Sequence, residues 1–145
     1  MARKPIRIFV DSDVVISSLI STSGAASMLL HNTESVELYV SNFSILELER
    51  VVERLKLDKK KLHKVIDSRL SSVDIKQPYK MVRREEFLYY VRDFDDAHIV
   101  AGAKKSGATF LVSYNVRHFE AEKIKQDLKI ILLTPGLFLQ YLRSL

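Results

Sequence analysis

The feature that most constrains the fold is the alternation of short apolar runs with longer stretches of helical period. Strand-length apolar runs occupy residues 6–10, 36–40, 109–112 and 129–133. Between successive runs, apolar residues recur every three or four positions, which is typical of helices with one buried face. Parallel strands need such helical crossovers. We therefore expect an α/β fold: a single domain over residues 1–145, with a central, mostly parallel sheet of four to five strands and helices on both faces.

The helical pattern predicts seven helices. They are expected over residues 14–20, 25–31, 42–56, 59–70, 95–106 and 116–126, and in a C-terminal segment after Pro135 and Gly136. Gly107 suits the end of the fifth helix, because a glycine readily takes the left-handed conformation that closes helices. Residues 71–80, which contain Pro78, are expected to be irregular or to form a short edge strand.

Composition excludes several classes of site. The chain has no cysteine, so it has no disulfide, thiolate metal site or thiol nucleophile. It also has no run near the ~20 apolar residues that a membrane-spanning helix needs, so we expect a cytoplasmic protein without a membrane partner. Lys and Arg outnumber Asp and Glu by 23 to 18, a net charge of +5. This balance suits a polyanionic ligand, although it is also an ordinary aid to solubility.

Polar residues follow two of the predicted strands. Asp11 comes directly after residues 8–10, while Ser113 and Asn115 follow residues 110–112. In open α/β sheets, ligands bind beyond the carboxyl ends of the strands, so these side chains are expected at one edge. Glu47 and Asp96 stand near the starts of two predicted helices. Carboxylates gathered there would repel one another unless a divalent cation lay among them, so the pattern predicts a metal-dependent active site.

Each of these residues also has a purely structural interpretation. Asp11 can cap the next helix, and Glu47 follows Ser44 at the spacing of a capping box. Asp96 belongs to a group of acids that favours a helix N-terminus, where Asp95 is the better candidate for the cap. Asn115 is a common turn residue.

The two histidines in this part of the sequence, His98 and His118, have no second histidine at metal-ligand spacing. We interpret them as packing or surface residues.

Taken together, four segments resemble the successive motifs of PIN domains. They are residues 8–17 (IFVDSDVVIS), the helix that carries Glu47, residues 93–101 (DFDDAHIVA) and residues 110–119 (FLVSYNVRHF). The resemblance spans nearly the whole chain and implies a doubly wound parallel sheet. It also implies a ribonuclease that depends on Mg²⁺ or Mn²⁺, a class that includes the VapC-like toxins of toxin–antitoxin pairs. A cognate antitoxin protein and a homodimer are then expected partners.

Carried over by position, the resemblance makes three carboxylates both catalytic residues and metal ligands: Asp11, Glu47 and Asp96. It places Ser113 and Asn115 in the fourth motif, where the family often has an acid instead of the asparagine. Asp13 stands where the family commonly has an asparagine, so it returns some negative charge to the site.

In the mechanism that this resemblance implies, the bound cation activates a water that attacks the RNA backbone in line. Arg117, and more weakly Arg7, are candidates for holding phosphates of the RNA substrate. Single-stranded or looped RNA is favoured, because its backbone can bend into a cleft.

Two other functions remain open. The first is a catalytically weak or silent PIN domain that only binds RNA or protein, which Asn115 makes plausible. The second is a haloacid dehalogenase-like phosphatase with Asp11 as nucleophile and Asp13 as general acid. Motif order disfavours the phosphatase, because that family has a Ser/Thr strand end and a lysine before its paired acids, whereas here Asp95 and Asp96 precede Ser113.

Overall fold

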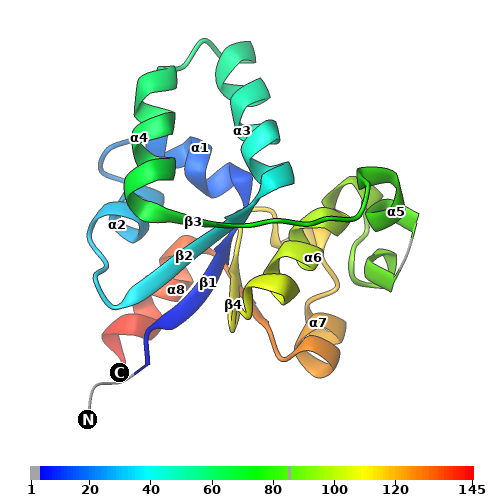
Figure 1. Ribbon diagram of the computed structural model, residues 1–145. Helices are drawn as coiled ribbons and strands as arrows, with labels where there is room; N and C mark the ends of the chain where they lie inside the picture. Colours follow the sequence, from blue (N-terminus) through cyan, green and yellow to red (C-terminus); the bar gives the residue numbers. More distant parts are fainter. Residues whose placement is uncertain (1–3, 85) are drawn as a thin grey trace.

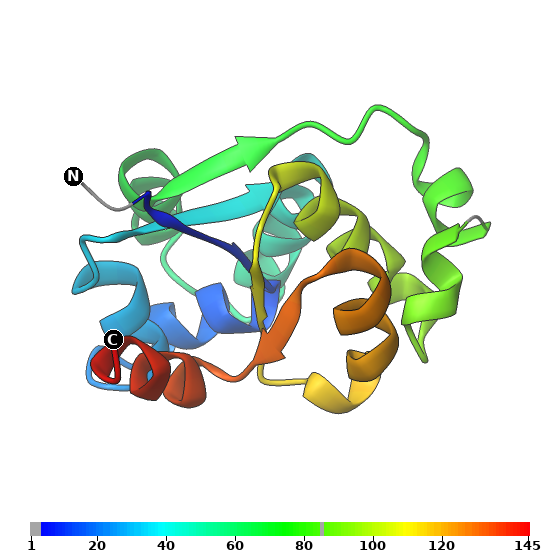
Figure 2. The same cartoon turned by 90° about the horizontal axis from the view of Figure 1, so that it is seen from below.

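The computed structural model describes residues 4–84 and 86–145, so residues 1–3 and 85 of the predicted domain lie outside the described part. Five strands form one sheet in the order β3-β2-β1-β4-β5, and every neighbouring pair is parallel (Figures 1 and 2). The strands are β1 (Ile6–Val10), β2 (Val36–Ser41), β3 (Leu70–Val73), β4 (Phe110–Val112) and β5 (Ile131–Leu133). The predicted α/β fold class is confirmed.

Eight α-helices and three short 3-10 turns accompany the strands in the described part of the chain. The α-helices are α1 (Ser12–Ile20), α2 (Ala25–His31), α3 (Asn42–Arg54), α4 (Lys59–Arg69), α5 (Tyr79–Arg84), α6 (Ala97–Ser106), α7 (Ala121–Leu128) and α8 (Pro135–Arg143). The 3-10 turns are η1 (Glu86–Tyr90), η2 (Phe94–Asp96) and η3 (Val116–His118).

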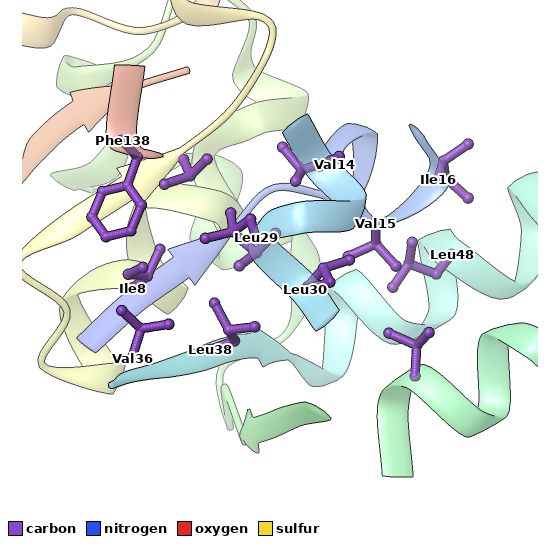
Figure 3. Packing of buried hydrophobic residues seen from close by; sticks show 14 of the residues in the cluster. Ile8, Val14, Val15, Ile16, Leu29, Leu30, Val36, Leu38, Leu48 and Phe138 are labelled. Atoms are coloured by element: carbon purple, nitrogen blue, oxygen red, sulfur yellow. The ribbon is translucent and has the colours of Figure 1, made fainter. Parts of the chain in front are cut away.

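Alternate residues of the strands enter two separate cores, because successive side chains of a strand point to opposite faces. Ile8 of β1 packs with residues of α1 to α4 and α8, a layer that Figure 3 shows around Leu29, Leu48 and Phe138. Phe9 enters the other core, together with apolar side chains of η1, α6 and α7. Helices therefore cover both faces of the sheet, as expected.

The sheet has its topological switch point between β1 and β4. From β1 the chain moves outward through β2 to β3, and then returns to the other side of β1 to form β4 and β5. The helix after β1 packs on the first core, whereas α7, after β4, packs on the second. Connections that leave neighbouring strands toward opposite faces open a ligand-binding crevice at the carboxyl edge.

Helix α6 packs unusually close to the sheet, at Gly102. A Cβ atom added there would lie 2.5 Å from the Phe9 ring, so a larger residue would push the helix away from β1. The helix ends at Gly107, whose φ of 70° confirms the predicted left-handed cap. This contact places the N-terminus of α6, and with it Asp96, beside the end of β1.

The structure corrects the predicted helix at residues 116–126. That segment divides into η3 and α7, with Phe119 extended between them and bridged to Val91. Two backbone hydrogen bonds flank Phe119: Arg92 N donates to His118 O (2.8 Å) and Glu120 N donates to Tyr90 O (2.9 Å). The helix is interrupted because these backbone groups bond to residues 90–92 and not within a helix.

The predictions for residues 59–80 also need correction at their boundaries. The helix predicted over residues 59–70 ends at Arg69, and Leu70 begins β3. The remainder is not wholly irregular: β3 is the expected edge strand, and α5 starts at Tyr79. Within the described residues, no single helix is long and apolar enough to cross a membrane; α1 and α2 pass that test only as a pair bent by 100°.

Candidate active site

Asp11 stands at the crevice, directly after β1 and at the N-cap of α1. One carboxylate oxygen, Oδ1, accepts a hydrogen bond from Ser12 N at 2.7 Å, and the other accepts from Ser113 Oγ at 2.8 Å. The side chain is only 7% exposed. The capping interpretation is therefore correct for one oxygen, while the second oxygen joins Asp11 to the segment that follows β4.

Asp13 approaches the same serine from α1. Its Oδ2 accepts a hydrogen bond from Tyr114 N at 3.0 Å and lies 3.4 Å from Ser113 Oγ. Its Oδ1 is buried and has no hydrogen-bond partner among the described residues. Ser113 also accepts a bond from Asn115 N at 2.9 Å, so this one hydroxyl connects the β1 and β4 loops.

Glu47 lies on α3, and its partner is a histidine. Its Oε2 is 3.3 Å from His98 Nε2, and the Glu47 side chain is 44% exposed while His98 is 2% exposed. The capping-box interpretation is wrong, because α3 begins at Asn42 and its cap is Ser41, which accepts from Ser44 N at 3.1 Å. Glu47 is thus free of any capping duty.

Asp96 has a second histidine as its partner. His118 Nδ1 lies 3.2 Å from Asp96 Oδ2, and this contact joins the start of α6 to η3. Asp96 occupies the N-cap position of α6 but makes no capping bond with its side chain. The cap of the preceding turn is Asp93, which accepts from Asp95 N at 2.9 Å, so the expectation that Asp95 is the cap was wrong.

Among the four carboxylates, Asp11 has the most strongly shifted pKa. Burial raises the pKa of Asp11 well above its usual value, and the charge of Asp13 raises it further. The hydrogen bond from Ser113 opposes these effects, whereas the charges of Asp96 and Glu47 add to them. The four carboxylates are therefore close enough to interact, and the ionised form of Asp11 is disfavoured while no cation accompanies it.

The other three acids differ in their surroundings. Burial raises the pKa of Asp13, against the hydrogen bonds from Tyr114 and Ser113, and burial also raises the pKa of Asp96, against the charge of its histidine. Burial would raise the pKa of Glu47 too, but the hydrogen bond and charge of His98 outweigh it, so that pKa is lowered.

The oxygen donors fit a hard divalent cation, although they do not form a finished cage. Within residues 4–84 and 86–145, no three Asp, Glu or His side chains already converge as a metal-binding group. The buried, unpartnered Oδ1 of Asp13 and the mutual repulsion at Asp11 are nevertheless the conditions that a cation would relieve. Carboxylate oxygens are the ligands that Mg²⁺ and Mn²⁺ prefer.

The remaining predicted residues differ in their placement. Asn115 is exposed and its backbone shapes the turn, accepting from His118 N at 3.0 Å. Arg117 is exposed on the same turn. Arg7 lies near the opposite end of β1, about 13 Å from Asp11 at ~3.3 Å per strand residue. There Arg7 contacts Glu37 (3.6 Å) and Ser106 O (3.3 Å), so its guanidinium is held away from Asp11.

His98 is buried and His118 is half exposed, as expected of packing and surface residues. In addition, each contacts a site carboxylate, Glu47 and Asp96 respectively, which was not predicted. His98 lies two residues after Asp96, on the helix that the acidic motif begins, which was the one available local signal. Their partners lie 51 and 22 residues away, so only the fold brings these pairs together.

A scan against family models matches the PIN domain over residues 7–117. This match includes the β1 end, Glu47, Asp96 and the segment after β4. It gives no support to the phosphatase alternative. No curated protein matches the sequence.

Several solved structures share the fold. They include VapBC2 from Rickettsia felis bound to a DNA fragment from its promoter (18% identity, TM-score 0.59, 88% of this chain and 97% of that chain covered). FitAcB from Neisseria gonorrhoeae is similar (17% identity, TM-score 0.54, 89% of this chain and 98% of that chain covered). So is VapC20 from Mycobacterium tuberculosis, a toxin that cleaves the sarcin–ricin loop (16% identity, TM-score 0.52, 72% of this chain and 86% of that chain covered).

Proposed function

Because the chain belongs to the PIN domain family, we propose that it is a metal-dependent endoribonuclease. The observation that carries the proposal is the buried Asp11 carboxylate, on which three other carboxylates act at the switch point of the sheet. Such a group destabilises the protein unless it binds something, so a strongly shifted pKa in a crevice favours a functional role. One solved structure with the same fold, VapC20, is that of a toxin that cleaves the sarcin–ricin loop.

Asp11, Glu47 and Asp96 would hold the cation, with Asp13 nearby. When bound, Mg²⁺ or Mn²⁺ would supply an acidified water and neutralise charge on the scissile phosphate. Ser113 fixes the orientation of Asp11 through the 2.8 Å bond, and His98 and His118 do the same for Glu47 and Asp96. Partners of this kind orient metal ligands and tune their basicity.

Substrate binding needs cations outside the acidic centre. Arg117 is exposed on η3, one residue before the histidine that contacts Asp96. Its guanidinium suits bidentate contact with a phosphate that flanks the cleaved one. A single-stranded or looped RNA fits best, because its backbone can follow the crevice.

RNA cleavage by purified protein tests the proposal. A labelled RNA of mixed sequence is incubated with wild type, with Asp96→Asn, and with Asp67→Asn, which makes the same charge change on the exposed face of α4. Wild type and Asp67→Asn should cleave with Mg²⁺ or Mn²⁺ and stop in EDTA, and Asp96→Asn should not cleave. Equal cleavage by all three proteins would contradict the assignment of Asp96.

A toxin role in a toxin–antitoxin pair is the finer form of this proposal. It rests on the fold shared with the VapBC2 and FitAcB structures and includes a cognate antitoxin, a homodimer and a cytoplasmic site of action. Exposed apolar residues between positions 51 and 70 would mediate the dimer contact, and Leu55, which is 47% exposed at the end of α3, is one of them. Expression of this chain alone should arrest growth, and co-expression of the neighbouring gene should relieve the arrest.

The alternative of a catalytically silent domain keeps one supporting observation. Asn115 stands where the family often has an acid, and it is exposed at the start of η3. A silent domain would bind RNA equally with and without EDTA and would release no product at any metal concentration.

A further inference from the structure

A cavity of about 540 Å³ lies beside Glu47, and the mechanism above uses only Glu47 and His98 of its lining. Its walls include Phe43, Glu47 and Arg50 of α3 together with Tyr79, Asp95 and His98. Helices α3, α5 and α6, which supply most of these residues, lie together in Figure 1, and α5 packs on α6. Cavities of roughly 300–1,000 Å³ with a few polar groups are typical small-ligand sites.

Three aromatic rings form one wall. The Phe43 and Tyr79 ring centroids are 5.4 Å apart with planes at 73°, and Phe43 and His98 are 6.2 Å apart at 75°. Tyr79 and His98 are 5.7 Å apart at 48°. No two of these rings are parallel, and all three residues line the cavity, so a flat ligand inside it can contact aromatic side chains. Bases of single-stranded nucleic acid stack on such side chains.

Polar groups in the wall favour a nucleotide over an aliphatic side chain of a protein partner. Arg50 is exposed one helical turn after Glu47, and an arginine there suits a phosphate. His98 is 2% exposed and its Nε2 faces Glu47, so this ring orients Glu47 at the cavity wall. An aliphatic occupant would make no use of Arg50.

We propose that this cavity binds the base of one nucleotide of single-stranded RNA, adjacent to the phosphate cleaved at the carboxylates. The base stacks on Tyr79 and Phe43, and Arg50 contacts a neighbouring phosphate. This inference rests on the proposed ribonuclease function, and it names the part of the site that selects a nucleotide. Because Glu47 belongs to both the cavity and the acidic centre, a base held here fixes which phosphate reaches the carboxylates.

Abasic scanning of the RNA tests the proposal. A labelled hexanucleotide and six versions, each lacking the base at one position, are titrated in EDTA by fluorescence anisotropy. Wild type should lose about tenfold in affinity at one position and much less at the others, since stacking of a single base is worth roughly this amount. In Tyr79→Leu, removing the base at that position should lower the affinity no more than at the other positions. Tyr79→Phe, which keeps the ring, should behave like wild type.

Controls separate a lost contact from a lost fold. Tyr89→Leu removes another aromatic ring, 55% exposed and outside the cavity, and should leave the abasic profile unchanged. Thermal unfolding of each variant identifies any that fails to fold, and Phe43→Leu then provides the second ring deletion. The same RNA panel with Mg²⁺ gives kcat/KM, which reports the profile even if affinity in EDTA is low.

The outcomes distinguish this proposal from the one on which it rests. A flat abasic profile in wild type, or an identical profile in Tyr79→Leu, would overturn the base-binding cavity while cleavage in Mg²⁺ upheld the nuclease. Absence of both binding and cleavage for every RNA would overturn both proposals. A single sensitive position that depends on the Tyr79 ring would support the cavity as the nucleotide-selecting part of the site.

Discussion

The two ends of strand β1 carry charged residues in opposite arrangements. Near the amino end, Arg7 has an acid as its neighbour, Glu37 at 3.6 Å, and its guanidinium lies over the Tyr39 ring. At the carboxyl end, Asp11 is buried and its charged neighbours within the crevice include three acids. The amino end is thus arranged for stability, whereas the carboxyl end gives up stability to hold like charges together, as functional sites do.

We expect the largest effect from removing the charge of Asp11, at the carboxyl end of β1. Asp11→Asn keeps the size of the side chain and can still accept from Ser12 N, but it removes the negative charge that the proposed cation would bind. We expect RNA cleavage to fall by more than about 100-fold, beyond the ~10–100-fold typical of residues that only orient a ligand. Initial rates in Mg²⁺ measure it. A variant that cleaves like wild type would show that Asp11 has no part in catalysis.

The same substitution should stabilise the protein in EDTA. The folded pKa of Asp11 is raised, by burial first and then by Asp13, so folding disfavours the ionised form. Stability is therefore lost as pH rises from the unfolded pKa of about 4 through the folded value, and the whole penalty is present above it. Asp11→Asn should gain about 1–3 kcal/mol at neutral pH.

Urea unfolding of both proteins between pH 4 and 8 checks this prediction. The wild-type curve should fall toward high pH more steeply than the Asp11→Asn curve, and Mg²⁺ should stabilise wild type more than the variant. A lower stability of Asp11→Asn in EDTA at neutral pH would mean that the protein itself stabilises the ionised carboxylate without a cation. That result would contradict the claim that the carboxyl end of β1 is destabilised by like charges.

A smaller effect is expected at His118, which only orients Asp96. His118→Asn should weaken activation by Mg²⁺ about tenfold, and high Mg²⁺ should restore most of the rate. The matched control is His63→Asn, which changes an exposed histidine on α4. Loss of rate that no Mg²⁺ concentration restores would mean that His118 contributes to the chemistry directly.

We expect the smallest effect at the amino end of β1, where the charge of Arg7 is paired with Glu37. Arg7→Gln should change the free energy of unfolding by no more than about 1 kcal/mol, because exposed ion pairs contribute little. Cleavage and RNA affinity should equal those of wild type, since Arg7 lies away from the crevice. A clear loss of RNA affinity would show that RNA reaches the amino end of the sheet.

Features of the fold that depend on local sequence could be predicted. Residues 8–10 of the first strand are buried on both faces of the sheet, and residues 25–31 have one apolar face. The structure reproduces the predicted bounds of both elements, 6–10 and 25–31. The break at Phe119 could not be predicted, because its cause is pairing with Val91, 28 residues earlier in the chain. Strand β3 was hard to define since it is a short edge strand with two exposed serines.

The candidate site shows the same division. Asp11 and Ser113 could be placed together from sequence, because both follow strands that the alternating pattern identifies, and their side chains meet at 2.8 Å. From sequence, Glu47 could be either a capping residue or a site residue; the structure excludes capping, because Ser41 caps α3. The histidine partners could not be anticipated, because each pairing depends on how α6 packs against α3 and η3.

Titration with Mn²⁺ tests most directly the claim that the carboxyl end of β1 binds a divalent cation. Metal-free wild type, Asp11→Asn and Glu37→Gln are compared by electron paramagnetic resonance of the free ion, since both variants remove one negative charge, at opposite ends of the sheet. We predict a saturable site in wild type and Glu37→Gln that is at least about tenfold weaker in Asp11→Asn. Equal binding by all three proteins would contradict the account.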